Sequence, residues 1–288
     1  TCSTITPADY EMEQTGGVIV EQVVRPTGLL EPPIEVRSSL NQVDDLLEEI
    51  DNTVKKGERV LVTTLTKRMA EELSKYFMRL NINCRYIHSE VETLERVEIL
   101  RDLRLGVFDV LIGVNLLREG LDLPEVSLVA VMDADKEGFL RNQRSLTQIA
   151  GRAARNANGK VIMYADTITD SMQRTIDETN RRREKQIRYN ADHNIIPMTV
   201  TKSKEQIMGQ TAVLKIKPAE ANAYVEQEEI TLVADPVATY MSKDQLEKSI
   251  RDTRKKMERA AKDLDFIEAA KYRDEMYATE KLMKERFG

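Results

Sequence analysis

The sequence predicts an α/β protein in which helices cover both faces of a parallel sheet, followed by a small antiparallel helical hairpin at the C-terminal end. From about residue 38 to residue 190, short aliphatic and β-branched runs alternate with helical segments about 12–16 residues long. Strands that alternate with helices of this length form crossover units, which build a parallel sheet. The last 47 residues contain 24 charged side chains and, before Gly288, neither Gly nor Pro, which favours helix.

The first predicted helix begins at Ser39, which forms a capping box with Gln42. It ends at residues 55–57, where two lysines and a C′ glycine follow one another. A strand-like run at residues 60–65 comes next. The apolar positions of this helix, at helical spacing, are Leu40, Val43, Leu46, Leu47, Ile50 and Val54.

The following elements repeat this alternation. A second helix is predicted over residues 69–80 and a strand over residues 84–88. Ser89 and Glu92 form the capping box of a third helix, which ends at Gly106. Three further strands of the buried type are predicted at residues 110–112, 128–131 and 161–163.

The pattern divides the chain into four parts. Residues 1–37 are expected to link the domain at residues 38–196 to an N-terminal domain that the sequence does not contain. The last part of the domain at residues 38–196 is a long, polar, Arg-rich helix over residues 166–192 that leaves it. Residues 197–241 lack sustained periodicity and are interpreted as a linker, and residues 242–288 form the hairpin.

The hairpin is predicted from two narrow apolar seams, whose register breaks at residues 263–266. So small a hairpin has little core of its own, so pairing with a second helical hairpin, including self-association, is expected. The first seam contains Leu246, Ile250, Met257, Ala260 and Leu264, and the second contains Ile267, Ala270, Met276 or Tyr277, and Met283.

Composition excludes several classes of protein. The 288 residues are 41% apolar, enough for a core, yet no run of about 18 apolar residues exists that would span a membrane. Cys2 and Cys84 lie far apart, which excludes a disulfide framework and a thiolate zinc site and favours reduced thiols in the cytoplasm. His88 and His193 are too few and too distant for a histidine metal site. The start on Thr1, without Met or a signal pattern, indicates a fragment.

Charge is distributed unevenly along the chain. The formal net charge is −6, and residues 1–58 carry 4 basic and 12 acidic side chains. Residues 141–188 carry 11 basic and 5 acidic side chains, a local charge of +6. The overall acidity therefore does not exclude a polyanionic ligand, because the local field decides binding.

The most informative stretch for chemistry is the octapeptide QIAGRAAR at residues 148–155. On a helix, Gln148, Arg152 and Arg155 are spaced 4 and 3 apart and project from one face. Gly151 costs about 1 kcal/mol in a helix interior, and close approach by a backbone or a ligand is a reason to keep it. Two guanidinium groups one turn apart suit a phosphate chain; the alternative is a solvated arginine face, or pairing with carboxylates elsewhere in the fold.

This stretch resembles motif VI, Q-x-x-G-R-x-x-R, of the superfamily 2 helicases, whose C-terminal motor domain has a RecA-like fold. The resemblance implies that Arg152 and Arg155 act as arginine fingers on the γ-phosphate of ATP and that Gln148 couples nucleotide to nucleic acid. Residues 113–124 resemble motif V and residues 60–67 resemble motif IV. The residues implied beside the nucleotide are Gly120, Asp122 and Gly151, and those implied near the DNA backbone are Thr63, Thr64, Lys67, Asn115 and Arg118.

Longer segments resemble one family more narrowly, the UvrB proteins of the bacterial excinuclease ABC system, which are damage-verifying ATPases of nucleotide excision repair. They include LLREGLDLP at residues 116–124, DADKEGFL at residues 133–140, GRAARNANG at residues 151–159 and VEQVVRPTGLL at residues 20–30. LDFIEAA at residues 264–270 resembles the UVR hairpin of that family. The resemblance implies DNA and the other two excinuclease proteins, UvrA and UvrC, as partners, with the nuclease UvrC docking at Leu264, Phe266, Ile267 and Ala270.

The phosphate-binding motif G-x-x-x-x-G-K-[ST] does not occur in this sequence. We therefore expect ATP and magnesium to be bound mainly by an N-terminal half that the sequence does not contain, and the isolated chain to hydrolyse no ATP. Two alternatives stay open: a module that serves only to dock partners through residues 242–288, and the second lobe of another superfamily 2 translocase.

Overall fold

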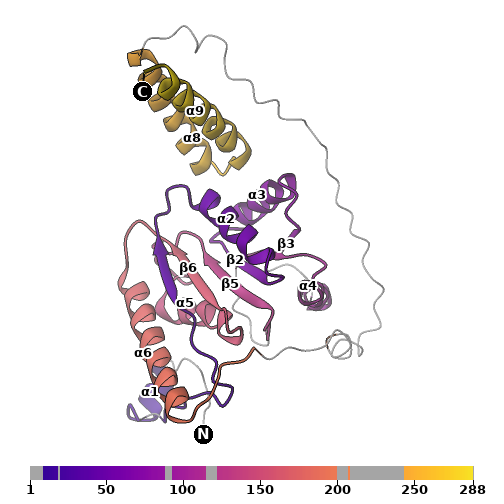
Figure 1. Ribbon diagram of the computed structural model, residues 1–288. Coiled ribbons are helices and arrows are strands. Elements are labelled where there is room, and N and C mark those ends of the chain that lie inside the picture. The colour runs from indigo at the N-terminus through magenta and orange to yellow at the C-terminus, as the bar shows by residue number, and fades with distance from the viewer. Residues whose placement is uncertain are drawn as a thin grey trace. The chain divides into compact units, whose positions relative to one another are not determined.

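The computed structural model describes residues 9–18, 20–87, 93–114, 122–199, 207 and 243–287 (Figure 1). The chain divides into two compact units. The first contains residues 1–67 and 83–216, and the second contains residues 68–82 and 217–288. Each unit is described by itself.

The first unit is built on a sheet of six strands in the order β1-β6-β5-β2-β4-β3. Every neighbouring pair is parallel, which confirms the predicted sheet type. The edge strand β1 was not predicted, because four residues after a Pro-Pro pair carry too little pattern. The strands are β1 (Ile34–Arg37), β2 (Arg59–Thr63), β3 (Cys84–Ile87), β4 (Val110–Gly113), β5 (Val126–Val131) and β6 (Lys160–Tyr164).

In the chain, helices α2 to α5 lie between strands, α1 precedes β1, and α6, α8 and α9 follow β6. The described helices are α1 (Asp9–Gln14), α2 (Gln42–Val54), α3 (Lys67–Arg79), α4 (Thr93–Leu105), α5 (Gln143–Ala150), the 3₁₀ turn η1 (Ala153–Arg155), α6 (Asp170–Asp192), α8 (Lys243–Lys262) and α9 (Phe266–Phe287).

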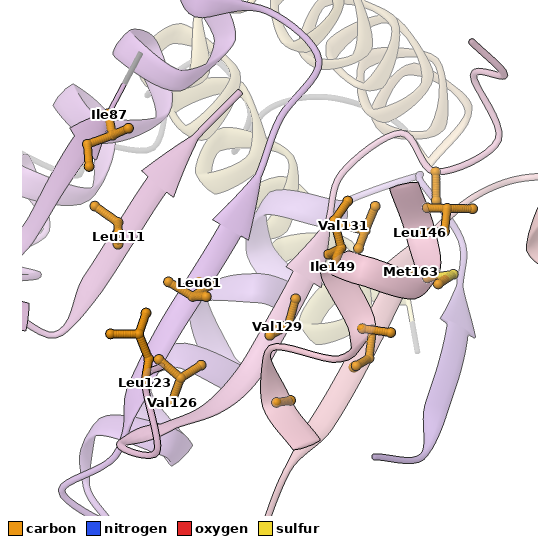
Figure 2. Close-up of a cluster of buried hydrophobic side chains, with 14 of the residues drawn as sticks. Leu61, Ile87, Leu111, Leu123, Val126, Val129, Val131, Leu146, Ile149 and Met163 are labelled. Atoms are coloured by element: carbon orange, nitrogen blue, oxygen red, sulfur yellow. The ribbon is translucent and has the colours of Figure 1, made fainter. Parts of the chain in front are cut away.

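Helices cover both faces of the sheet. On one face, aliphatic side chains of the strands form a buried cluster with Leu103 of α4 and with Leu146 and Ile149 of α5 (Figure 2). Side chains alternate along a strand, so Val60 and Val62, on either side of Leu61, point to the opposite face. Helix α2 lies there against β2 and β5. The labelled strand residues of the cluster are Leu61, Ile87, Leu111, Val126, Val129, Val131 and Met163.

The capping box predicted at Ser39 is wrong. Helix α2 begins at Gln42, and the side chain of the preceding Asn41 makes no capping bond. The Ser39 hydroxyl donates instead to Asp166 Oδ2 at 2.6 Å, and the side-chain amide of Gln42 donates to Asp133 Oδ1 at 3.2 Å. The side chains of Ser39 and Gln42 thus bond to carboxylates that are distant in the sequence and not to the backbone at the start of the helix. The box predicted at Ser89 and Glu92 lies outside the described residues.

The glycines predicted to end two helices do so. Gly57 follows α2 and Gly106 follows α4, each with φ 76°. Glycine adopts this left-handed conformation at little cost in free energy because it has no Cβ. The conformation ends the helix at its C-terminus.

The predicted long polar helix is confirmed as α6. It packs along the domain, however, and does not leave it as predicted. The helix begins at Asp170, and Thr169 caps it by accepting a hydrogen bond from Met172 N at 3.3 Å. Met172 belongs to the main buried cluster, and α6 lies beside α5. Periodicity did not show this packing because further buried side chains of α6, including Gln186 and Asn190, are polar.

The hairpin of the second unit has the predicted break. Leu264 adopts φ 63° between α8 and α9, and Asp265 caps α9 by accepting from Glu268 N at 3.0 Å. The first seam is buried at Leu246, Ile250, Met257 and Ala260 as predicted. The second seam is partly wrong: Phe266, Ala269 and Met276 are buried, Ile267 and Ala270 are half-buried, and Tyr277 is exposed. None of the described helices is long and apolar enough to cross a membrane.

Candidate functional site

The carboxyl ends of β2 and β5 form the topological switch point of the sheet. These strands are neighbours, and the chain leaves β2 toward β3 on one side and β5 toward β6 on the other. Ligands of open parallel sheets bind beyond the strand ends at such a point. The polar residues that follow these strands are therefore the candidates for function.

A fully buried arginine joins the two strand ends. Arg141 Nη2 donates to Thr63 O at 3.2 Å and to Met132 O at 2.9 Å, and its Nη1 donates to Leu140 O at 3.0 Å. Burial lowers the pKa of Arg141 to about 10, so the side chain stays charged at neutral pH. Arg141 was not predicted, because nothing in its local sequence pattern distinguishes a buried arginine from a solvated one.

The residues predicted to lie near the DNA backbone differ in their exposure to solvent. Thr63 and Thr64 are buried, and Thr64 Oγ1 donates to Thr66 O at 3.2 Å. Lys67 is exposed at the first position of α3. Asn115 and Arg118 lie outside the described residues.

The stretch from Gln148 to Arg155 is not the continuous helix that the spacing predicts. Helix α5 ends at Ala150, Gly151 forms its C-cap with φ −60°, and η1 follows. The tight approach expected at Gly151 occurs at Gly159 instead. A Cβ on Gly159 would lie 2.1 Å from Ala153 O, whereas a Cβ on Gly151 would lie 3.4 Å from its nearest neighbour. The close approach at Gly159 was not predicted from the sequence.

The two predicted arginines lie at the ends of turn η1: Arg152 is its N-cap and Arg155 is its last residue. Arg155 Nη1 lies 3.4 Å from Asp122 Oδ1, which joins the segments that resemble motifs VI and V. The Arg155 side chain is 62% exposed and that of Asp122 is 44% exposed, so their mutual attraction is weak. Burial and the neighbouring charge of Arg155 both lower the pKa of Arg152. Two cations at a partly exposed turn are suited to bind an anion that relieves their repulsion.

A buried asparagine holds the end of this turn. Asn156 Nδ2 donates to Pro124 O at 3.0 Å, and its Oδ1 accepts from Asn158 N at 2.8 Å. The turn is thereby attached to the segment that contains Asp122. The role of Asn156 was not predicted, since its acceptor at Pro124 lies 32 residues away in the sequence.

The other predicted residues are only partly brought together. Gln148 is half-buried on α5, while Gly120 lies outside the described residues, as does His88. In the part of the chain that the structure describes, no three His, Cys, Asp or Glu side chains group in a way that could hold a metal ion.

The predicted docking residues cluster around the turn of the hairpin. Phe266 is buried, and its ring centroid lies 6.2 Å from that of Tyr76 within the second unit. Leu264, Ile267 and Ala270 are half-buried, so each keeps part of its apolar surface accessible.

Three sequence families match parts of this chain. The family described as Helicase conserved C-terminal domain matches residues 40–157, Ultra-violet resistance protein B matches residues 163–205, and the UvrB/uvrC motif matches residues 247–282. The UvrABC system protein B of Bacteroides fragilis is 65% identical over 283 residues, which cover 98% of this chain. The chain belongs to the UvrB family.

Other UvrB relatives agree. The proteins of Bacteroides thetaiotaomicron and Streptococcus equi subsp. zooepidemicus, both named UvrABC system protein B, are 64% and 55% identical over 98% and 93% of this chain. The chain spans 42% of the length of the two Bacteroides relatives and 38% of the Streptococcus one.

Two solved helicase structures are similar to parts of this chain. The yeast protein in the structure of S. cerevisiae Dbp5 bound to RNA and ADP BeF3 is 19% identical, with a TM-score of 0.45 over 62% of this chain and 47% of that chain. Domain 2 of the DEAD-box helicase Mss116p is 13% identical, with a TM-score of 0.41 over 88% of this chain and 86% of that chain.

Proposed function

We propose that this chain is the C-terminal motor part of a damage-verifying ATPase in bacterial nucleotide excision repair. In this proposal, Arg152 and Arg155 act on ATP as arginine fingers. The observation that carries the proposal is turn η1, where Arg155 lies beside Asp122 and where burial, together with the charge of Arg155, lowers the pKa of Arg152. Membership in the UvrB family supports this assignment.

The chemistry follows from the charges at η1. Negative charge spreads over the oxygens of the transferred phosphoryl group in the transition state, and a preorganised guanidinium stabilises that charge. Such a finger accelerates phosphoryl transfer by about 10³–10⁵-fold. Gln148, Gly151, Asp122 and Gly120 are proposed to border the nucleotide. The rest of the full-length protein would bind most of the ATP and its magnesium ion, because this sequence lacks the phosphate-binding loop.

The experiment is an ATPase assay of the full-length protein. Arg152→Ala is expected to lower kcat by at least about 10³-fold. Circular dichroism of the variant should match that of the wild type. The matched control is Arg144→Ala, which removes an exposed arginine from the neighbouring helix α5 and should leave turnover unchanged. Normal turnover by Arg152→Ala would refute the proposal, as would magnesium-dependent hydrolysis by the isolated 288-residue chain.

Contact with the DNA backbone is proposed for the carboxyl edge of the sheet. Lys67 supplies an exposed cation there, and the buried Thr63 and Thr64 form the strand end before it. Asn115 and Arg118, outside the described residues, are proposed as further contacts from the resemblance to motif V. Contacts to phosphates give affinity that depends on salt but not on base sequence. Lys67→Ala in the full-length protein should weaken DNA binding equally for unrelated sequences and reduce the salt dependence. An unchanged affinity at low salt would exclude Lys67 from the interface.

Partner docking by the hairpin is the second candidate function, and the match to the UvrB/uvrC motif favours it. We propose that the half-buried Leu264, Ile267 and Ala270 around its turn, together with the buried Phe266, bind UvrC, the nuclease of the excision system. UvrA is proposed as a further partner of the full-length protein, and self-association as a further use of the hairpin. Membership in the UvrB family sets aside the alternative of another superfamily 2 translocase.

A further inference from the structure

Arg25 connects the segment before the sheet to the turn that carries the two arginines. Its Nη1 donates to the carbonyl oxygen of Ala154, the middle residue of η1, at 3.1 Å. Its Nη2 forms an ion pair with Glu31. One planar guanidinium thus contacts two acceptors at once, which a lysine ammonium on a flexible stem does not reproduce.

The backbone of Arg25 is held in place by α6. Arg25 N donates to Gln186 Oε1 at 2.7 Å, and Gln186 Nε2 donates back to Arg25 O at 3.1 Å. Gly28 N also donates to Arg25 O at 3.0 Å, which closes a turn with Pro26 at its second position and Gly28 at φ 71°. Gln186 is buried, so this clamp is shielded from water. The backbone from which the Arg25 side chain extends is therefore held in a fixed position.

Turn η1 needs such outside support. It has three residues, and the last carbonyl groups of any helix lack partners inside the helix. Ala154 is buried, so water is a poor substitute as donor to its carbonyl. Glu31 pairs with Arg25, which reduces the repulsion that a further cation would add beside Arg152 and Arg155.

We infer that Arg25 is a positioning residue, which holds η1 in the conformation that presents Arg152 and Arg155 to a phosphate. This role rests on the proposed function, since it concerns how the arginines at η1 are held in position. Arg25 itself does not touch the nucleotide. Its effect passes through the carbonyl of Ala154, which lies between the two arginines in the chain.

The test uses the full-length protein and compares Arg25→Ala with Arg183→Ala. Arg183 donates to the carbonyl of Glu31, so it holds the same segment to α6 without contacting η1. Arg25→Ala should lower kcat by about 10–100-fold, because a shift of about 1 Å in a catalytic group costs about 10²-fold. Its KM for ATP and its affinity for ADP alone should change less than about 3-fold.

A transition-state mimic separates positioning from general stability. Affinity for ADP with aluminium fluoride should fall in Arg25→Ala by the same factor as kcat, since only this complex needs the arginines in place. Arg183→Ala should retain both kcat and this affinity. Arg25→Lys, which keeps the charge but not the fork, should recover part of the loss and serves as the variant to measure if Arg25→Ala does not fold.

Two results would overturn the inference. The first is an Arg25 variant, whichever of the two is measured, whose kcat and affinity for ADP with aluminium fluoride equal those of the wild type. The second is an equal loss in Arg183→Ala, which would show that only the stability of the segment matters. Both leave the proposed function intact if Arg152→Ala is inactive, whereas an active Arg152→Ala refutes the proposed function whatever Arg25 does.

Discussion

At the scale of single residues, the geometry of the candidate site depends on close contacts around η1. Gly159 allows two parts of the backbone to approach, because any Cβ there would overlap Ala153 O at 2.1 Å. Asn156 fills its buried position with a side chain that both donates and accepts. Neither residue carries the proposed chemistry, yet both shape the turn that does.

Gly159→Ala should destabilise the isolated chain by at least about 1–3 kcal/mol, because the backbone must move to make room for the methyl group. Urea denaturation measures the change in unfolding free energy. Gly138→Ala is the matched control: apart from its two chain neighbours, nothing lies within 4 Å of its Cβ position, so its effect should stay within about 0.5 kcal/mol. Equal stabilities of the two variants would contradict the close approach at Gly159.

Asn156→Ala should cost about 1–3 kcal/mol, because Pro124 O loses its donor in a buried place. The comparison is Asn158→Ala, which removes an exposed amide that bonds to Glu58 at 2.9 Å and should be nearly neutral. Thermal denaturation of both variants measures the difference. A neutral Asn156→Ala would mean that the attachment to Pro124 contributes nothing to stability.

At the scale of elements, α6 is the helix that binds the segment before the sheet. Its buried polar side chains bond to the backbone of Arg25 and Gly28, and its exposed face pairs with acids of the chain before it. Arg181 forms ion pairs with both Glu178 and Glu21. A polar face therefore has a structural use here that hydrophobic periodicity alone does not detect.

Glu178 should make the stability of α6 depend on pH. Hydrogen bonds from Arg181 and Arg182 lower the pKa of Glu178 from 4.5 to about 2. A carboxyl group with a lowered pKa in the folded state stabilises the protein above its unfolded pKa. That contribution is lost as the pH falls toward 2. Glu178→Gln should therefore flatten the decline of the thermal midpoint below about pH 4.5.

Measuring the thermal midpoint between about pH 2 and pH 7 tests this expectation. The control is Glu184→Gln on the same helix, where the carboxylate is 67% exposed and lies 3.8 Å from Arg188. This variant should keep the pH dependence of the wild type. Identical curves for all three proteins would show that the pairs of Glu178 with Arg181 and Arg182 do not couple to folding.

At the scale of the whole molecule, the two units suggest a separation of tasks. The first unit contains the sheet and η1, and the second contains the hairpin that matches the UvrB/uvrC motif. We expect the first to serve nucleotide and DNA and the second to serve partner proteins.

Deletion of residues 243–288 from the full-length protein tests this separation. ATPase activity should stay within about 2-fold of the wild type, since η1 and the strand ends are untouched. Binding to UvrC, measured by co-purification or titration, should be lost. The point variant Ile267→Glu changes the hairpin less than the deletion does. It places a charge on a half-buried apolar position beside the turn and should also weaken UvrC binding. A deletion that keeps UvrC binding would exclude the hairpin as the docking site.

The sequence by itself determined the parallel sheet, the helices between its strands and the break at residues 263–266. These features follow from local signals, namely periodicity and glycines at helix ends. Only the tertiary structure decided that Ser39 bonds to Asp166 and that Arg25 supports η1. Their partners lie 127 and 129 residues away, and a hydrogen bond over such a separation depends on folding and not on neighbouring residues.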